Sequence, residues 1–152
     1  MNMHATVENT SDAMIHALIA AERRPSHLIG PALDYWVGKA LGKPVMVVRH
    51  QREDGFFCVL KGLDGRIVGW SPSTDWSVGG PISQSAQIAL EPVYRVEGCG
   101  VRKSLIGWAA LHPKNHGGLL RYRGEGKDQL QAAMRALVSA RYGDYVPTVD
   151  RA

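Results

Sequence analysis

The chain has 152 residues, of which 45% are apolar and 21% charged, which is the composition of a globular domain. A chain of this length buries roughly two-thirds of its unfolded surface, so its core needs no disulfide or metal. No stretch reaches the roughly 20 apolar residues of a membrane-spanning helix, and the N-terminus lacks a secretory signal pattern. We therefore expect a cytoplasmic protein without a membrane partner. The two cysteines, Cys58 and Cys99, lie in apolar, strand-like segments and are expected to be buried free thiols.

The positive charge is concentrated in the second half of the chain. The formal net charge is +4, but residues 1–91 contain 8 basic and 9 acidic residues, whereas residues 92–152 contain 10 basic and 5 acidic residues. The two halves therefore carry −1 and +5. This asymmetry allows a polyanionic partner, although many proteins of this size are mildly basic without binding one.

Two helices are predicted in the first part of the chain. A short helix is predicted to begin at Ser11 or Asp12, either of which can cap it, and to end before Pro25, and the first ten residues show no periodic pattern. A second helix is predicted to open at Gly30-Pro31 and to stop at Gly42. Its apolar stripe consists of Leu33, Trp36, Val37, Ala40 and Leu41, and leaves Asp34 and Lys39 facing away.

From Val45 onward the apolar pattern changes to the period of two that is typical of strands. Three strands are predicted over residues 45–48, 56–60 and 66–70, joined by turns of which the second contains Asp64-Gly65, a strong hairpin signal. The third strand leads into a loop over residues 71–81. In this loop Ser73 or Thr74 is predicted to cap a single helical turn, which Gly79-Gly80-Pro81 would end.

Shorter strands and one well-defined helix are predicted for the rest of the chain. The strands are expected over residues 87–90, 93–97, 105–111 and 119–123, and Pro92 marks a break or an edge strand. The last helix has Asp128 in its first turn and ends at Gly143, with apolar residues at helical spacing between them. Strands joined by short turns, with helices at the flanks, indicate a single α+β domain: an antiparallel sheet covered by helices, or small α-β-α sandwich.

Three blocks of the sequence resemble one known family. The blocks are Leu33-Asp34-Tyr35-Trp36-Val37 with Ala40 and Gly42, Ser71-Pro72-Ser73-Thr74-Asp75-Trp76 with Gly79-Gly80-Pro81-Ile82, and Ala132-Ala133-Met134-Arg135-Ala136 with Val138 and Tyr142-Gly143-Asp144. Their order and spacing are similar to those of the NinX-like proteins of phages and prophages. The resemblance implies a phage-derived accessory protein in a bacterial host and supplies no catalytic residue. It divides the chain into an N-terminal extension with a short helix (1–27), a NinX-like domain (28–147) and a C-terminal tail (148–152), with an insertion over 97–123.

The signature loop, defined as residues 71–81, allows three interpretations. Ser73, Thr74 and Asp75 could serve a small hydrolase-like enzyme, but no histidine can be assigned as a base, so we favour caps that satisfy backbone donors. Alternatively, the loop binds a host protein as an antagonist, with Trp70 or Trp76 as a platform. The residues of the family signature are Ser71, Pro72, Ser73, Thr74, Asp75, Trp76, Gly79, Gly80 and Pro81.

The preferred hypothesis is binding to nucleic acid through the basic second half. Lys and Arg can neutralise phosphates and a tyrosine ring can stack on an unpaired base, although a solvated basic face explains the same residues. The candidate contact residues are Arg102, Lys103, Lys114, Arg121, Tyr122 and Arg123, in a run that also contains Trp108 and Lys127. His112 and His116 have the spacing of metal ligands only on a helix, and their surroundings favour a loop. We therefore expect no cofactor, no metal and no catalytic residue.

Overall fold

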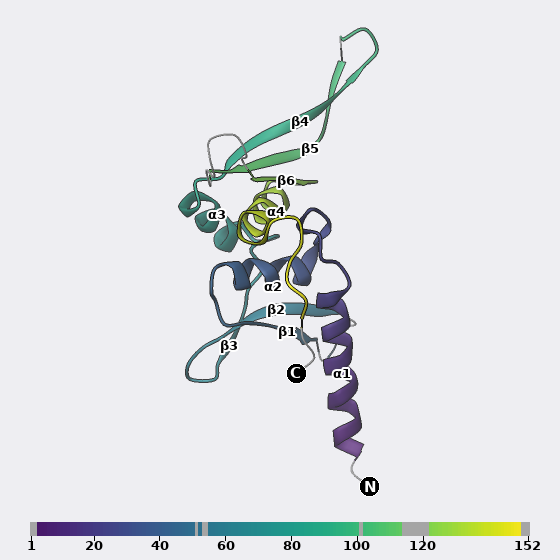
Figure 1. Cartoon of the computed structure of the whole chain (residues 1–152), viewed down its shortest axis with the longest axis vertical. Coiled ribbons are helices and arrows are strands. Elements are labelled where there is room, and N and C mark those ends of the chain that lie inside the picture. The colour runs from purple at the N-terminus through teal and green to yellow at the C-terminus, as the bar shows by residue number, and fades with distance from the viewer. Residues whose placement is uncertain (1–2, 51, 53–54, 101, 114–121, 150–152) are drawn as a thin grey trace.

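The computed structural model describes residues 3–50, 52, 55–100, 102–113 and 122–149. These residues form four α-helices, one 3-10 helix and six strands (Figure 1). The helices are α1 (Met3–Ala20), η1 (Pro25–His27, the 3-10 helix), α2 (Gly30–Ala40), α3 (Trp76–Ser85) and α4 (Gln129–Tyr142). The strands are β1 (Val45–Arg49), β2 (Phe56–Lys61), β3 (Ile67–Gly69), β4 (Ala89–Glu97), β5 (Arg102–His112) and β6 (Tyr122–Gly126).

The described strands form two antiparallel sheets, with the orders β1-β2-β3 and β4-β5-β6. The α+β class and the antiparallel pairing are therefore confirmed, but the layers are arranged differently from the expected sandwich. Figure 1 shows α4 and α2 between the two sheets, whereas α1 and α3 lie at the periphery. The reason is the burial of α4 on nearly every side, since Leu130, Ala132, Ala133, Met134, Ala136, Leu137, Val138 and Ala140 are all buried. A helix that is apolar around most of its circumference lies in the interior.

Glycines allow β6 to lie directly on α4. Gly124 and Gly126 face the helix with the period of two that a strand requires. A methyl group on Gly126 would lie 2.6 Å from the Ala132 backbone nitrogen, and one on Gly124 would lie 3.0 Å from the Ala136 Cα and closer still to two backbone atoms of α4. The close contact therefore depends on small residues on both elements.

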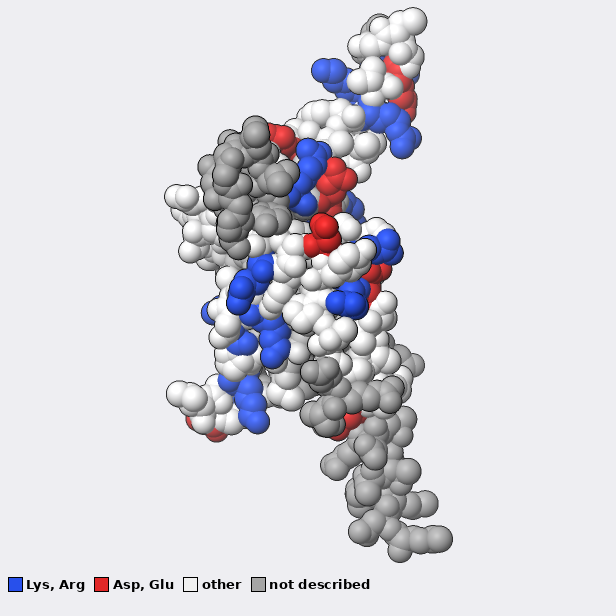
Figure 2. Space-filling model, in the orientation of Figure 1, with Lys and Arg blue, Asp and Glu red and all other residues white. Residues whose placement is uncertain are grey.

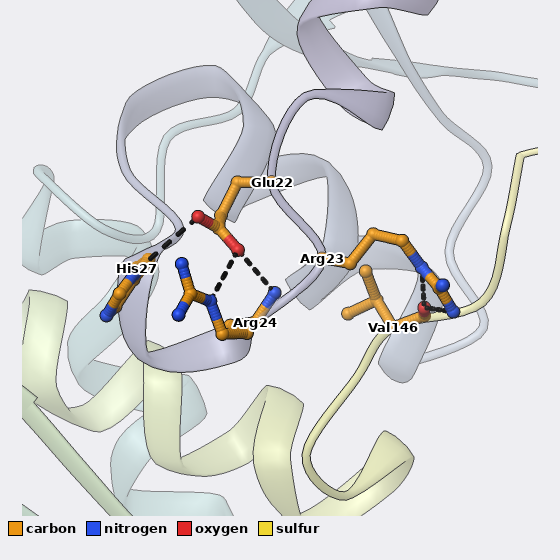
Figure 3. Close-up of polar contacts among 5 residues, drawn as sticks. All are labelled: Glu22, Arg23, Arg24, His27 and Val146. Carbon is orange, nitrogen blue, oxygen red and sulfur yellow. Dashed lines mark hydrogen bonds and ion pairs between the residues drawn. The ribbon is translucent and has the colours of Figure 1, made fainter.

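The N-terminal helix is longer than predicted. α1 begins at Met3, not at Ser11 or Asp12, because the first 20 residues contain neither glycine nor proline to interrupt it. Its C-terminal half joins the core, since Ile19 is buried there. Arg23 fixes the link to η1 by donating two hydrogen bonds, of 3.1 and 3.0 Å, to the Val146 carbonyl, and its own carbonyl accepts the Val146 N–H (Figure 3). The segment after α1 and the segment after α4 are thus held together.

The prediction that Gly79-Gly80-Pro81 ends a single helical turn was wrong. α3 runs from Trp76 to Ser85 through these residues, and its N-cap is Asp75, not Ser73 or Thr74. Proline at position 81 removes one backbone hydrogen bond, but tertiary packing compensates, since Val78 and Ile82 pack against the core. Gly79 is also fitted closely against the Pro72 carbonyl, where a side chain would clash.

β4 and β5 form a hairpin that extends well beyond β6. Their register runs from Ala89 opposite Leu111 to Glu97 opposite Arg102, with an irregularity at Val93/Tyr94. The prediction of separate short strands is corrected to this one long hairpin, and the predicted edge strand at Pro92 is confirmed because β4 lies at the edge of its sheet. Beyond the irregularity, the hairpin projects away from the body of the protein (Figure 1).

Candidate functional site

The first candidate site is the projecting part of the hairpin, residues 94–105, which we call the arm. Directly opposed residues of an antiparallel pair share a face and successive residues alternate between faces. One face therefore carries Tyr94, Val96, Lys103 and Leu105, and the other carries Arg95, Glu97, Arg102 and Ser104. Each of these eight residues is exposed. The arm thus presents cations together with an exposed tyrosine.

The positive charge of the arm is largely uncompensated. It contains Arg95, Arg102 and Lys103 but only one acidic residue, Glu97, in its described part. None of the three cations forms an ion pair within 4.0 Å in the described ranges. Figure 2 shows Lys and Arg side chains on the projecting hairpin, with acidic atoms nearby. These cations are therefore free to bind an external anion.

A cavity of about 550 Å³ lies where the arm meets the body. Its basic lining residues are His27, Arg123, Lys127 and Arg135. Arg135 already donates to the carbonyls of Leu28 (2.9 Å) and Glu125 (2.7 Å), and burial lowers the pKa of its guanidinium. Arg123 is paired with Glu125 at 3.0 Å. Arg123 is therefore paired with a carboxylate and the donors of Arg135 are occupied by carbonyls, whereas Lys127 is the exposed cation of this lining that forms no ion pair with another described residue.

His27 belongs to a group of polar contacts at the edge of this cavity. The Glu22 carboxylate accepts hydrogen bonds from the backbone and side chain of Arg24 at 2.8 and 3.2 Å and lies 3.5 Å from His27 (Figure 3). These contacts, the Arg24 backbone N–H first among them, lower the pKa of Glu22 to about 2. The group holds the chain between α1 and η1, and its role is structural.

The predicted nucleic-acid contacts do not form one cluster. Arg102 and Lys103 lie together at the far end of the arm, whereas Arg123 lies opposite Leu111, on the body of the protein beyond the arm. Leu111 is the ninth residue after Arg102 in β5, which places it about 30 Å away along an extended strand. Lys114, Arg121 and the side chain of Tyr122 are outside the described part of the chain. Sequence analysis did not name Tyr94 and Arg95 as contact residues. Both belong to the extended segment predicted over residues 93–97, and this segment was the available signal.

In the signature loop, Ser73 is buried against α2. Its backbone N–H donates to Oδ1 of Asp34 at 2.9 Å, and both residues are only 4% exposed. The prediction that Asp34 faces away from the core was therefore wrong, because the loop supplies a buried donor that replaces water. The Ser73 hydroxyl is buried beside this carboxylate without a hydrogen bond of good geometry to a described atom, although its proximity still favours the ionised form of Asp34 and so lowers the pKa of that carboxyl.

The three polar residues of the loop point to different partners. Asp75 caps α3 by accepting from the backbone N–H and hydroxyl of Ser77 at 2.9 and 2.7 Å, and these bonds, the hydroxyl's first, lower the pKa of Asp75. Thr74 is exposed, while Ser73 lies against Asp34. Of the three, Asp75 is the cap, and the arrangement does not bring a nucleophile, a base and an acid together. Trp76 is 52% exposed, whereas Trp70 is buried.

A second cavity, of about 310 Å³, lies beside this loop. Asp34, Cys58, Trp70 and Thr74 are among its lining residues. Burial raises the pKa of Asp34 to about 6, against the effect of the Ser73 hydroxyl and amide. Burial, and then the neighbouring Asp34, raise the pKa of the Cys58 thiol to about 12. Cys99, by contrast, is exposed at the end of the arm, which corrects the expectation that both thiols are buried.

Among the described residues, no group of three or more His, Cys, Asp or Glu side chains could hold a metal ion. His116, which the sequence analysis considered together with His112, lies outside the described residues. In the described part of the chain, the helices are too short or too polar to cross a membrane.

The comparisons with known proteins agree with the three sequence blocks. A search among curated proteins found no match. The model of the family described as bacteriophage P22 NinX matches residues 24–141, which include α2, the signature loop and most of α4. Because this match covers well over half of the chain, the protein belongs to the NinX family of phage proteins.

Proposed function

We propose that this phage accessory protein binds nucleic acid through the arm. The observation that carries the proposal is the set of three exposed cations, Arg95, Arg102 and Lys103, which have no ion-pair partner among the described residues. Lys and Arg side chains neutralise phosphates and release counterions, and this effect supplies most of the affinity in sequence-independent binding.

The shape of the arm supports the same proposal. A two-stranded antiparallel ribbon fits into a groove of duplex DNA, and exposed Tyr94 offers a ring for an unpaired base. The distance of about 30 Å between Arg102 and Leu111, opposite which Arg123 lies, is close to one turn of duplex, about 34 Å. A duplex that contacts both Arg102 and Arg123 must therefore span about ten base pairs.

The test is a fluorescence-polarisation titration with single- and double-stranded DNA and RNA, at about 50 and 200 mM salt. Duplexes of about 8 and 24 base pairs test the length requirement. The variant has Arg95→Gln, Arg102→Gln and Lys103→Gln together. Its matched control has Lys39→Gln, Lys43→Gln and Lys61→Gln, which remove the same charge from exposed residues outside the arm.

We expect affinity to fall steeply with salt in the natural protein. The arm variant should lower the slope of log K against log salt by about 3, because roughly 0.9 counterion is released per neutralised phosphate. Arg123→Gln should have a smaller effect, since Arg123 is already paired with Glu125. The proposal is wrong if no probe binds at low salt, or if the arm variant and the control variant bind alike.

A second candidate function is binding to a host protein through Trp76. Its supporting observation is the 52% exposure of a large apolar side chain at the start of α3. In a pull-down from host lysate, this function requires a stoichiometric host protein that is retained by the natural chain and lost with Trp76→Ala. Nucleic-acid binding by the arm should be unchanged in that variant, so the two functions can be distinguished.

A further inference from the structure

Asp34 is a buried carboxylate without a cationic partner. It is 4% exposed, and the described residues place no Lys, Arg or His within 4.0 Å of it. Its recorded hydrogen bond is the one from the Ser73 N–H, at 2.9 Å. Buried carboxylates are normally paired with a cation or bonded by several donors, because their loss of hydration is costly. Asp34 therefore retains capacity for a further donor.

The carboxylate borders a cavity whose other walls are mostly apolar. Phe56, Cys58, Trp70 and Thr74 line it together with Asp34. Phe57 also borders it, but its ring lies on the opposite face of β2, against His50. At about 310 Å³ it is near the lower end of the range for small-molecule sites, which combine apolar walls with a few polar groups. Among the described residues, Asp34 is the carboxylate of this lining and no Lys, Arg or His belongs to it. A ligand of matching chemistry is small, apolar in its body and positively charged at one end.

We propose that the cavity beside the signature loop binds a small organic ammonium ion whose charged group pairs with Asp34 and whose apolar body lies against Trp70 and Phe56. The aromatic rings add an attraction for a cation positioned over their faces. This site is separate from the arm, so it stands or falls independently of nucleic-acid binding. It also gives the family blocks of α2 and the loop a shared role beyond folding, since Asp34 comes from one and Thr74 from the other.

The electrostatic surroundings of Asp34 agree with this proposal. Burial raises the pKa of the carboxyl to about 6, so near neutral pH the group is ionised at a cost that a bound cation would offset. The other groups that face it are uncharged in this range: the Cys58 thiol of β2, whose pKa is raised to about 12, and the hydroxyl and amide of Ser73. Binding should therefore strengthen as pH rises from about 5 to 7.

The test uses three probes of similar size that differ in charge: 2-phenylethylammonium, 2-phenylethanol and phenylacetate. Two-dimensional amide NMR of the ¹⁵N-labelled protein follows the Ser73 N–H, which donates to Asp34, and the indole N–H of Trp70 in the cavity wall. The variant is Asp34→Asn. The matched control is Asp75→Asn, which neutralises an exposed carboxylate in the signature loop.

We expect the ammonium probe to shift the Ser73 and Trp70 signals in a saturable way, and to bind at least about tenfold more tightly than the alcohol. Phenylacetate should not bind. Asp34→Asn should weaken ammonium binding by at least about tenfold, and Asp75→Asn should leave it unchanged.

Three results would overturn the proposal: no shift with about 10 mM ammonium probe, equal binding of ammonium and alcohol, or equal binding by natural protein and a folded Asp34→Asn variant. If Asp34→Asn does not fold, the comparison of the three probes on the natural protein decides alone.

Discussion

The burial of Asp34 makes a quantitative prediction about stability and pH. The perturbation is Asp34→Asn, which keeps an acceptor oxygen for the Ser73 N–H but cannot ionise. In the folded protein, burial raises the pKa of Asp34 from its usual 3.8 to about 6. At about 1.4 kcal/mol per pH unit, this difference corresponds to about 3 kcal/mol of unfolding free energy.

The sign follows from which form the folded protein prefers. Because the pKa of Asp34 is raised in the folded state, folding favours the protonated carboxyl. Its contribution to the free energy of unfolding is fully present below the unfolded-state pKa of 3.8. That contribution is lost as pH rises through about 6. The natural protein should therefore lose about 3 kcal/mol relative to Asp34→Asn between about pH 3.5 and pH 7.5.

The assay is urea denaturation of both proteins at a series of pH values, followed by tryptophan fluorescence. Taking the difference between the two proteins removes the titration of all other groups, the histidines included. Asp75→Asn is the control with the opposite sign: the pKa of Asp75 is lowered by Ser77, so its smaller contribution is present at neutral pH and lost on acidification. A difference that is flat, or that grows with pH in favour of Asp34, would refute the reasoning and mean that the Ser73 bonds outweigh burial.

Three further predictions concern packing, capping and thiol reactivity. Gly124→Ala should destabilise the protein by about 1–3 kcal/mol in urea denaturation, because the added methyl group meets backbone atoms of α4 that cannot rotate away. The control is Gly55→Ala, whose methyl group meets no atom within 4 Å and which should leave the stability nearly unchanged. Asp128→Ala should cost about 1 kcal/mol in the same assay, since the carboxylate caps α4 by accepting the N–H of Gln131 at 2.8 Å. A maleimide should modify exposed Cys99 and spare Cys58, because the Cys58 thiol is buried and its pKa is raised to about 12. Mass spectrometry should find one adduct per chain, and two adducts on the folded protein would contradict this expectation.

Several elements were predictable because their signals are local. The helix that opens at Gly30-Pro31 and the last helix, which ends at Gly143, have apolar residues at helical spacing and recognisable ends. The hairpins of the first sheet follow from strand periodicity and from the Asp64-Gly65 turn. The family was also identifiable from the sequence, because its three blocks retain their order and spacing. In each case the information lies within a few residues of the feature that it determines.

The sequence by itself thus determined the α+β class, the family and most element types, whereas the tertiary structure decided how the elements are layered and where the candidate sites lie. Periodicity tells which face of a helix is apolar, but not that α4 lies between two sheets. The burial of Asp34 depends on a donor 39 residues away, and Pro81 stays inside a helix because distant contacts stabilise it. The separation of Arg102 from Arg123 depends on how far the hairpin extends beyond the sheet. These features rest on contacts between remote parts of the chain, which no local pattern encodes.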